Sequence, residues 1–268
     1  MRNKLIVILL DGCTREGTKA LGYLESLKES GACSRFDVMG ELPSLSRPMY
    51  ETIFTGLPVR KHGIVHNGVI RRSSFMSVFD LCKKAGYHTT MAAYYWMYEL
   101  FCEARFHYEN IMIDNDTETI NHGFFYFEDA FPDNHVYAMA EALIERYHDD
   151  LVVIHPMNID DQGHKFGKDS REYLAAIGKN DAYISEMIMR HQEEYDFMIF
   201  SDHGMNEKGL HGGNTAEERQ SFLYVLKEHF NAQEHLLTTC QLANLMCQLL
   251  GIESDENMEE CGVVFDER

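Results

Sequence analysis

Aspartate and histidine residues recur in this sequence at or shortly after the ends of short apolar runs. Six of them could act together: Asp11, Asp160, His164, Asp202, His203 and His211. Carboxylate oxygens combined with imidazole nitrogens suit zinc or manganese, whereas calcium binds imidazole poorly. A catalytic ion needs about three protein ligands and one open position, so six ligands divide into two sets. The residue types therefore predict a site for two divalent metal ions.

Each of these residues also has a purely structural explanation. An aspartate after a strand commonly caps a helix or forms a turn, and a single histidine more often lies at the surface or is satisfied within a core. For any one position this explanation is the stronger one. It must, however, account for all six residues at one edge of the same sheet, and their combination favours metal binding.

A candidate nucleophile lies in the segment 42–56, LPSLSRPMYETIFTG. Proline is common in the first turn of a helix, so Pro48 places Ser46 at or near a helix N-cap. A hydroxyl there faces free backbone N–H groups and the positive end of the helix dipole, and both favour a phosphate and a developing alkoxide. A plain serine cap is the alternative, and this segment alone favours it.

The elements that carry these residues alternate between strands and helices. The apolar run 5–10 is typical of a strand buried on both faces, and 18–29 has leucines at helical spacing. The same reasoning predicts strands at 88–94, 150–155, 196–201 and 222–226, and helices at 77–85, 136–147, 171–190 and 239–250. We therefore expect an α/β fold in which helices cover both faces of a mostly parallel sheet. Ligands bind outside the carboxyl ends of the strands in such sheets, which is where the six residues fall.

The chain of 268 residues is expected to form one domain, 1–268. Its least regular stretch, at about 95–133, is rich in aromatic residues: Trp96, Tyr98, Phe101, Phe106, Tyr108, Phe124, Phe125, Tyr126, Phe127 and Phe131. A long segment over the strand ends could form a cap or lid on a substrate pocket. Ordinary core packing is the alternative that we favour, because aromatic stripes are usually buried.

Charge and composition limit the class of partner. The formal net charge of −19 argues against a nucleic acid polymer or an anionic membrane, but a small phosphorylated substrate stays compatible because bound cations can reverse the local potential. Seven cysteines without CxxC spacing fit reduced thiols in a cytoplasm. The first apolar run ends early, at Asp11, and no run reaches the roughly 20 apolar residues of a membrane span. We expect a soluble, cytoplasmic protein whose oligomeric state is open.

Four motifs together resemble the alkaline phosphatase superfamily, and within it most of all the nucleotide pyrophosphatase/phosphodiesterase branch. They are LLDG at 9–12, PSLSRPMYETIFTGLPVRKHGIV at 43–65, DDQGHKFG at 160–167 and SDHGM at 201–205. They occur in the family's order and span most of the chain from Leu5 to about Leu226. The resemblance implies a three-layer α/β/α sandwich with a site for two metal ions, commonly zinc.

Carried over by position, the resemblance assigns ligands to the two ions. One ion would be held by Asp11, Ser46, Asp202 and His203, and the other by Asp160, His164 and His211. In the branch, the histidine that corresponds to His211 lies much farther along the chain, and the short spacing here is closer to compact phosphotransferase relatives. Asn67, shortly after the HGI motif, matches an asparagine that contacts a phosphoryl oxygen in the branch. A surface turn is the alternative for Asn67.

Three departures from related patterns bear on the substrate. The branch usually has threonine where this chain has Ser46, and often asparagine where it has Met49. Serine keeps a hydroxyl nucleophile. Sulfatases have arginine at the position of Tyr50, so this residue argues against sulfatase activity. Arg47 is a nearby cation that either contacts a phosphoryl oxygen or lies at the surface.

We therefore expect a metal-dependent hydrolase of phosphate esters, first of all a phosphodiesterase or nucleotide pyrophosphatase that acts through a phosphoseryl intermediate on Ser46. Tyr94 and Tyr95 are candidate residues of its substrate pocket. A phosphomonoesterase or a phosphomutase-like phosphotransferase is the second alternative. A non-catalytic module that binds metal and a phosphorylated ligand is the third, and Ser46 argues against it because a pure binding site needs no nucleophile.

Overall fold

One sheet of nine strands organises the part of the chain that this computed structural model describes, residues 2–227 and 236–263. The strands are β1 Leu5–Leu9, β2 Ser34–Met39, β3 Thr89–Tyr94, β4 Met112–Asp114, β5 His122–Tyr126, β6 Leu151–Ile154, β7 Asp196–Phe200, β8 Gln220–Leu226 and β9 Leu236–Thr238. Their order across the sheet is β4-β5-β3-β6-β1-β7-β8-β2-β9. Five of the eight strand pairs are parallel, and the three antiparallel pairs are β4 with β5, β7 with β8, and β8 with β2. The mostly parallel sheet expected from the sequence is confirmed.

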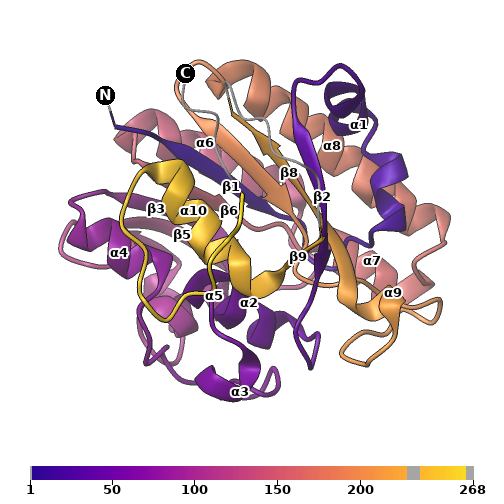
Figure 1. Ribbon diagram of the computed structural model, residues 1–268, viewed down its shortest axis with the longest axis horizontal. Coiled ribbons are helices and arrows are strands. Elements are labelled where there is room, and N and C mark those ends of the chain that lie inside the picture. Colours follow the sequence, from indigo (N-terminus) through magenta and orange to yellow (C-terminus); the bar gives the residue numbers. More distant parts are fainter. Residues whose placement is uncertain (1, 228–235, 264–268) are drawn as a thin grey trace.

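Helices cover both faces of this sheet (Figure 1). One face carries α2 Ser46–Thr55, α3 Val59–His62, α4 Val78–Lys84, α5 Tyr95–Phe101 and α10 Leu242–Leu250. The other face carries α1 Gly22–Glu29, α6 Asp133–Tyr147, α7 Asn158–Phe166 and α8 Arg171–His191. A short helix, α9 Ala216–Arg219, and the 3-10 segments η1 Glu16–Ala20, η2 Tyr108–Asn110 and η3 Thr239–Gln241 complete the described helices. The arrangement is the expected three-layer α/β/α sandwich.

Strand β1 shows why helices cover both faces of the sheet. Leu5, Val7 and Leu9 join the core on one side of the sheet, whereas Ile6 and Ile8 join the core on the other. All five side chains are fully buried. A strand buried on both faces has no position for a polar residue, and its sequence is therefore a continuous apolar run.

The sheet brings three strand ends to one edge. Strands β6, β1 and β7 are parallel neighbours, and Ile8 pairs with Ile154 on one side and with Ile199 on the other. Their carboxyl ends therefore lie side by side. Asp11 and the residues 155–164 and 202–203 follow these ends, so three segments that are far apart in the sequence meet at one place.

The segment 95–133 is mostly part of the sandwich. It supplies α5 and the strands β4 and β5 at one edge of the sheet, and Tyr98 and Phe125 from this segment join a core. The structure therefore contradicts a lid over most of this segment and agrees with the packing alternative. The sequence HGFFY of β5 lacks both alternation and β-branched residues, which is why its pattern did not predict a strand.

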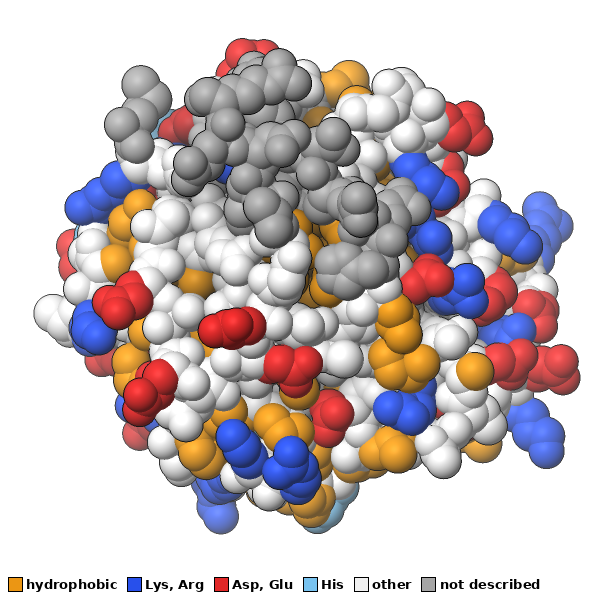
Figure 2. Space-filling model, viewed as in Figure 1, with side chains coloured by type: hydrophobic (Ala, Val, Ile, Leu, Met, Phe, Trp, Pro, Cys, Tyr) orange, Lys and Arg blue, Asp and Glu red, His pale blue; other side chains and the backbone are white. Residues whose placement is uncertain are grey.

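Acidic and basic side chains are interspersed on the face of the molecule that Figure 2 shows. The acidic side chains on this face are therefore not gathered into one patch. Within residues 2–227 and 236–263, no helix has both the length and the apolar character that crossing a membrane requires.

Candidate catalytic site

Ser46 opens helix α2 at the carboxyl edge of the sheet. The residue before it, Leu45, is extended (φ −106°, ψ 145°), so Leu45 is the N-cap and Ser46 is the first helical residue. Ser46 thus lies directly after the N-cap, in agreement with the expected place at or near it, and Pro48 lies in the first turn, where its missing N–H costs no hydrogen bond. The Ser46 Oγ lies 3.2 Å from Nε2 of His203. The hydroxyl therefore sits beside a candidate metal ligand and at the positive end of a helix.

A first cluster, made of Asp11, Asp202 and His203, surrounds this hydroxyl. All three side chains are 0% exposed. Nε2 of His203 lies 3.5 Å from Oδ1 of Asp11 and 3.4 Å from Oδ2 of Asp202. Two carboxylates and one imidazole nitrogen thus converge on the same point next to Ser46.

Backbone contacts orient the ligands of this cluster. Nδ1 of His203 donates to the carbonyl of Gly204 at 2.9 Å, so the lone pair of the ring is on Nε2, the atom that faces the two carboxylates. The N–H of Gly12 donates to Oδ1 of Asp202 at 3.2 Å and leaves Oδ2 for the cluster. Each side chain therefore presents one selected atom inward.

A second cluster consists of Asp160, His164 and His211. Asp160 and His164 are one turn apart on α7, which puts both on one face of the helix. Nε2 of His164 lies 3.2 Å from Oδ2 of Asp160 and 3.2 Å from Nε2 of His211, and the latter atom lies 3.8 Å from Oδ1 of Asp160. Nδ1 of each histidine donates to a backbone carbonyl, of Gly209 for His164 and of Ser44 for His211. The two Nε2 atoms therefore both face Asp160.

The two clusters adjoin each other. The rings of His203 and His211 stack with centroids 3.7 Å apart and an interplanar angle of 10°. Gly12 lies between Asp11 and Asp160: it has φ +64°, and a Cβ there would come within 2.5 Å of Oδ1 of Asp160. Glycine is therefore required at position 12 both by its backbone conformation and by the close approach of Asp160.

The donor atoms of these clusters fit divalent metal ions. In these two clusters, three buried carboxylate oxygens have no hydrogen-bond partner among the described residues: Oδ1 of Asp11, Oδ1 of Asp160 and Oδ2 of Asp202. A buried carboxylate without a partner is costly, and a cation compensates it. Two sets of candidate ligand atoms each lie within 4.8 Å of one another, namely those of Asp11, Asp202 and His203 and those of Asp160, His203 and His211. The structure thus brings together the six ligands predicted from the sequence, with Ser46 beside them.

Burial and the charges of neighbouring side chains shift the pKa values of the first cluster in different directions. Burial, followed by the nearby charge of Asp11, raises the pKa of Asp202 well above its ordinary value. Burial acts in the same direction on Asp11, but hydrogen bonds from His155 and His203 outweigh it and hold the pKa of Asp11 far below its ordinary value. Burial lowers the pKa of His203, yet Asp202 and Asp11 together raise it to about 10. Without metal, a proton on His203 therefore balances the carboxylates.

The two histidines of the second cluster have pKa values that are shifted in opposite directions. The hydrogen bond to Asp160 raises the pKa of His164 to about 9 although burial opposes it. Burial and the charge of His203 lower the pKa of His211 to about 4. At neutral pH the metal-free protein therefore holds His164 protonated and His211 neutral.

Zinc uptake is expected to release protons and to tighten as the pH rises from about 6 to about 9, because a histidine binds metal only in its neutral form. His203 and His164, with pKa values of about 10 and about 9, carry protons over most of this range and must lose them. Calorimetric titration with Zn²⁺ in two buffers of different ionisation enthalpy measures the release. An affinity that is flat over this range, with no proton released, would contradict the assignment of these histidines as ligands.

Asn67 reaches the start of α2. Asn67 lies in a partly exposed turn, and its Oδ1 accepts a hydrogen bond of 3.1 Å from the backbone N–H of Arg47, so this turn lies against the start of α2 beside Ser46. Tyr94 and Tyr95 lie where β3 passes into α5 at the same edge of the sheet, with ring centroids 4.7 Å apart. The hydroxyl of Tyr94 donates to Asp129 at 2.6 Å. A contact of any of these three residues with substrate stays a prediction.

The side chain of Arg47 is buried and paired with a carboxylate. It is 1% exposed, Nη2 donates to Oε2 of Glu99 at 2.6 Å, and the guanidinium lies 4.7 Å from the ring centroid of Trp96. Nε and Nη1 are buried and donate no hydrogen bond to any of the described residues. The alternative that Arg47 lies at the surface was wrong, because its ion pair with Glu99 on α5 depends on tertiary packing. A contact of Arg47 with a phosphoryl oxygen stays a prediction.

Replacing Arg47 with alanine is expected to lower the free energy of unfolding by about 3–5 kcal/mol, because the Glu99 carboxylate is then buried without its cation. Urea denaturation measures the change. Lys165→Ala is the matched control: it breaks the more exposed ion pair with Asp161 and should cost about 1 kcal/mol or less. Equal effects of the two variants would show that the buried pair contributes no more than a surface pair.

Two buried residues that the sequence did not predict as part of the site touch the first cluster. Nε2 of His155 lies 3.0 Å from Oδ2 of Asp11, and the hydroxyl of Tyr50 donates to the same oxygen. His155 ends the apolar run 150–155, so the strand-end rule that identified the other ligands could have included it. The role of Tyr50 has no sequence signal of its own beyond its place one turn after Ser46.

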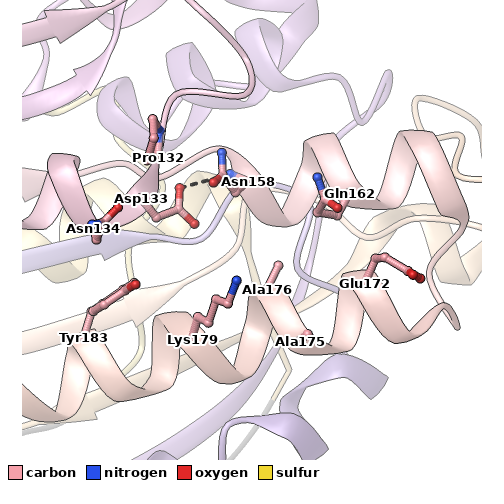
Figure 3. A pocket seen from close by; sticks show the side chains of 10 residues that line it. All are labelled: Pro132, Asp133, Asn134, Asn158, Gln162, Glu172, Ala175, Ala176, Lys179 and Tyr183. Carbon is pink, nitrogen blue, oxygen red and sulfur yellow. Dashed lines mark hydrogen bonds between the residues drawn. The ribbon is translucent and has the colours of Figure 1, made fainter.

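A separate pocket of about 400 Å³ lies between α7 and α8 (Figure 3). Asn158 and Gln162 of α7 line this pocket. They precede Asp160 and His164, respectively, by two residues in the sequence. Because an α-helix turns by about 100° per residue, these two pairs lie on opposite sides of α7. The pocket is therefore not part of the catalytic site.

The sequence of this chain is similar to those of enzymes that act on phosphate esters. The sequence model of the family described as "Type I phosphodiesterase / nucleotide pyrophosphatase" matches residues 5–211. The GPI ethanolamine phosphate transferase 2 catalytic subunit of Homo sapiens is 22% identical over 241 residues, which cover 85% of this chain and 24% of that protein. GPI ethanolamine phosphate transferase 2 of Saccharomyces cerevisiae is 33% identical over 82 residues, 29% of this chain and 10% of that protein. The chain thus spans at most about a quarter of the length of these two relatives.

Solved structures share the fold. The inactive variant of murine ectonucleotide pyrophosphatase/phosphodiesterase 5 in complex with AMP superposes with a TM-score of 0.74, covers 97% of both chains and is 14% identical in sequence. The C-terminal periplasmic domain of EcEptC from Escherichia coli has a TM-score of 0.68 at 13% identity and covers 95% of this chain and 84% of that one. At these identities the likeness shows the fold alone.

Proposed function

The chain belongs to the type I phosphodiesterase/nucleotide pyrophosphatase family, and on that premise we propose that it is a metal-dependent phosphodiesterase with Ser46 as its nucleophile. The observation that carries the proposal is the position of Ser46. Its Oγ lies 3.2 Å from a buried histidine nitrogen, in a cluster where one oxygen each of Asp11 and Asp202 lacks a hydrogen-bond partner among the described residues. A structural serine has no need of such surroundings, whereas an activated nucleophile does.

The start of α2 prepares Ser46 for attack on phosphorus. The first backbone N–H groups of this helix have no partner within the helix, and they and the helix dipole favour negative charge on the hydroxyl oxygen and on the phosphoryl group. Ser46 is only 3% exposed, so few waters compete with it for the phosphorus. Bound divalent cations would supply the Lewis acidity that lowers the pKa of the hydroxyl and stabilises the leaving oxygen.

The proposed reaction has two displacements. Ser46 Oγ forms a bond to phosphorus while the bond from phosphorus to the leaving oxygen breaks; Ser46 gives up its proton to solvent and the leaving oxygen takes one up. A water then attacks the phosphoseryl ester, which releases Ser46 and the second product. Asn67 accepts a hydrogen bond from the N–H of Arg47 at the start of α2, and its amide would donate to a phosphoryl oxygen.

The charge near Ser46 favours a diester over a monoester. A monoester dianion carries one more negative charge than a diester at the reacting group. Arg47, the cationic side chain next to Ser46 in the sequence, is neutralised by Glu99 and shielded from solvent. Arg47 is therefore not free to meet the second charge of a monoester.

We expect kcat/KM for bis(p-nitrophenyl) phosphate to exceed that for p-nitrophenyl phosphate by about tenfold or more, a difference of ~1.4 kcal/mol in transition-state stabilisation. Release of p-nitrophenol from both substrates under the same conditions measures the ratio. The Ser46→Ala variant, purified in parallel, corrects for contaminating phosphatases. A clear preference for the monoester would overturn the phosphodiesterase assignment and favour a phosphomonoesterase.

A phosphotransferase is the second candidate, favoured by the sequence similarity to proteins named GPI ethanolamine phosphate transferases. The first displacement would be the same, and an acceptor hydroxyl would replace water in the second. Product analysis with an added alcohol distinguishes the two. A phosphorylated alcohol that forms faster than the hydrolysis product would identify a transferase.

A further inference from the structure

Tyr50 and His155 are fully buried polar residues to which the proposed mechanism gives no role. Both direct a donor at a single atom, Oδ2 of Asp11, with Nε2 of His155 at 3.0 Å. We propose that Tyr50 and His155 are a positioning pair that commits Asp11 to bind metal through Oδ1 alone, and that this pair sets the affinity of the metal subsite next to Ser46. The inference rests on the proposed function and adds to it the residues that control one of its two subsites.

The backbone fixes the direction of the His155 hydrogen bond. Nδ1 of His155 accepts from the N–H of Tyr94 at 3.3 Å, so the ring proton is on Nε2 and is donated to Asp11. The carbonyl of His155 accepts from the hydroxyl of Tyr126 at 2.6 Å, which anchors the same residue at its backbone. His155 is therefore a donor held in place from two sides.

Tyr50 is held just as closely. It lies one turn after Ser46 on α2, and its ring meets the ring of His155 edge-on, with centroids 4.9 Å apart. Its hydroxyl also lies 3.1 Å from Nε2 of His155. The helix that carries the nucleophile thus also carries a donor to Asp11, which ties the position of Ser46 to that of the carboxylate.

Two donors on Oδ2 leave Oδ1 as the free oxygen of Asp11. Oδ1 has no hydrogen-bond partner among the described residues and lies 3.5 Å from Nε2 of His203. Among the described residues, Asp160 in the second cluster has no comparable pair, because its Oδ2 faces His164, itself a candidate ligand. Loss of a partner that orients a ligand typically costs 10–100-fold in metal affinity, and here the loss should fall on one subsite.

The test is a titration of the metal-stripped full-length protein with Zn²⁺ by calorimetry, repeated with Co²⁺ to record its visible absorption. The wild-type protein should bind two ions. Tyr50→Phe removes one oxygen atom and should weaken one of the two binding events by about 10–100-fold while the other is unchanged. The matched control is Tyr137→Phe, which removes another buried hydroxyl, bonded to Asn180 at 3.1 Å and not to any candidate ligand. It should bind both ions as the wild type does.

Variants of His155 test the positioning pair independently of Tyr50→Phe. His155→Leu should show the same selective weakening and a changed Co²⁺ spectrum, and His155→Gln, which keeps an N–H donor, should recover part of the affinity. If His155→Leu does not fold, Tyr50→Phe still decides the question because it alters only one atom.

The possible outcomes separate the two proposals. A wild-type protein that takes up fewer than two ions would overturn the proposed function. Two ions in the wild type with unchanged affinities in Tyr50→Phe would overturn the positioning pair alone. Equal weakening of both binding events would also overturn it, because a general loss of structure, and not the orientation of Asp11, would then explain the effect.

Discussion

Replacing Ser46 with alanine is expected to lower phosphodiester turnover by on the order of 10⁴-fold or more while the fold stays intact. The hydroxyl is the atom proposed to bond to phosphorus, and alanine leaves no oxygen to be activated. The side chain is buried and small, so its loss should change the free energy of unfolding by about 1 kcal/mol or less. Steady-state kinetics together with urea denaturation measure both effects.

Two further variants test whether the loss of turnover is specific to the hydroxyl of Ser46. Ser46→Thr keeps a hydroxyl and should retain part of the activity. Thr55→Ala removes another buried hydroxyl from the far end of α2, where it donates to the carbonyl of Glu51, and should leave turnover unchanged. Turnover of Ser46→Ala near the wild-type rate would mean that water attacks phosphorus directly and that no phosphoseryl intermediate forms.

Removing bound metal with a chelator is expected to abolish activity, and adding Zn²⁺ or Mn²⁺ should restore it. Without a cation, the buried oxygens of Asp11, Asp160 and Asp202 are left uncompensated or paired with protonated histidines. Metal content and kcat/KM, followed through stripping and reconstitution, should fall and rise together. Thermal unfolding should shift upward on reconstitution, because a ligand that binds only the folded state stabilises it.

Neighbouring residues on α7 provide the control for the metal prediction. Asp160→Asn should lose both metal and activity. Asp161→Asn changes the next carboxylate, which pairs with Lys165 and is not directed at the clusters, and it should keep both. Full activity of the metal-free wild-type protein, or equal losses in the two variants, would refute the metal site.

The carboxylates and histidines of the site could be predicted from the sequence because their positions follow from one rule. A strand buried on both faces must be apolar throughout, so the first polar residue after it marks the edge of the sheet. Asp11, Asp202 and His203 follow strands β1 and β7 in this way, and Asp160 and His164 share one face of a helix just beyond β6. The strand order β6-β1-β7 then brings them together.

The partners that orient these residues were decided only by the tertiary structure. His155 and Tyr50 meet at Asp11 across 105 residues of sequence, and Arg47 finds Glu99 on another helix. Such contacts depend on how helices α2 and α5 lie on the sheet, which the local apolar pattern does not encode. The sequence by itself determined which atoms could bind metal, since that is a property of residue type and strand end. The packing of distant elements decided which of those atoms are held in place and which cation is neutralised, because burial and partnership arise only when segments far apart in the chain come into contact.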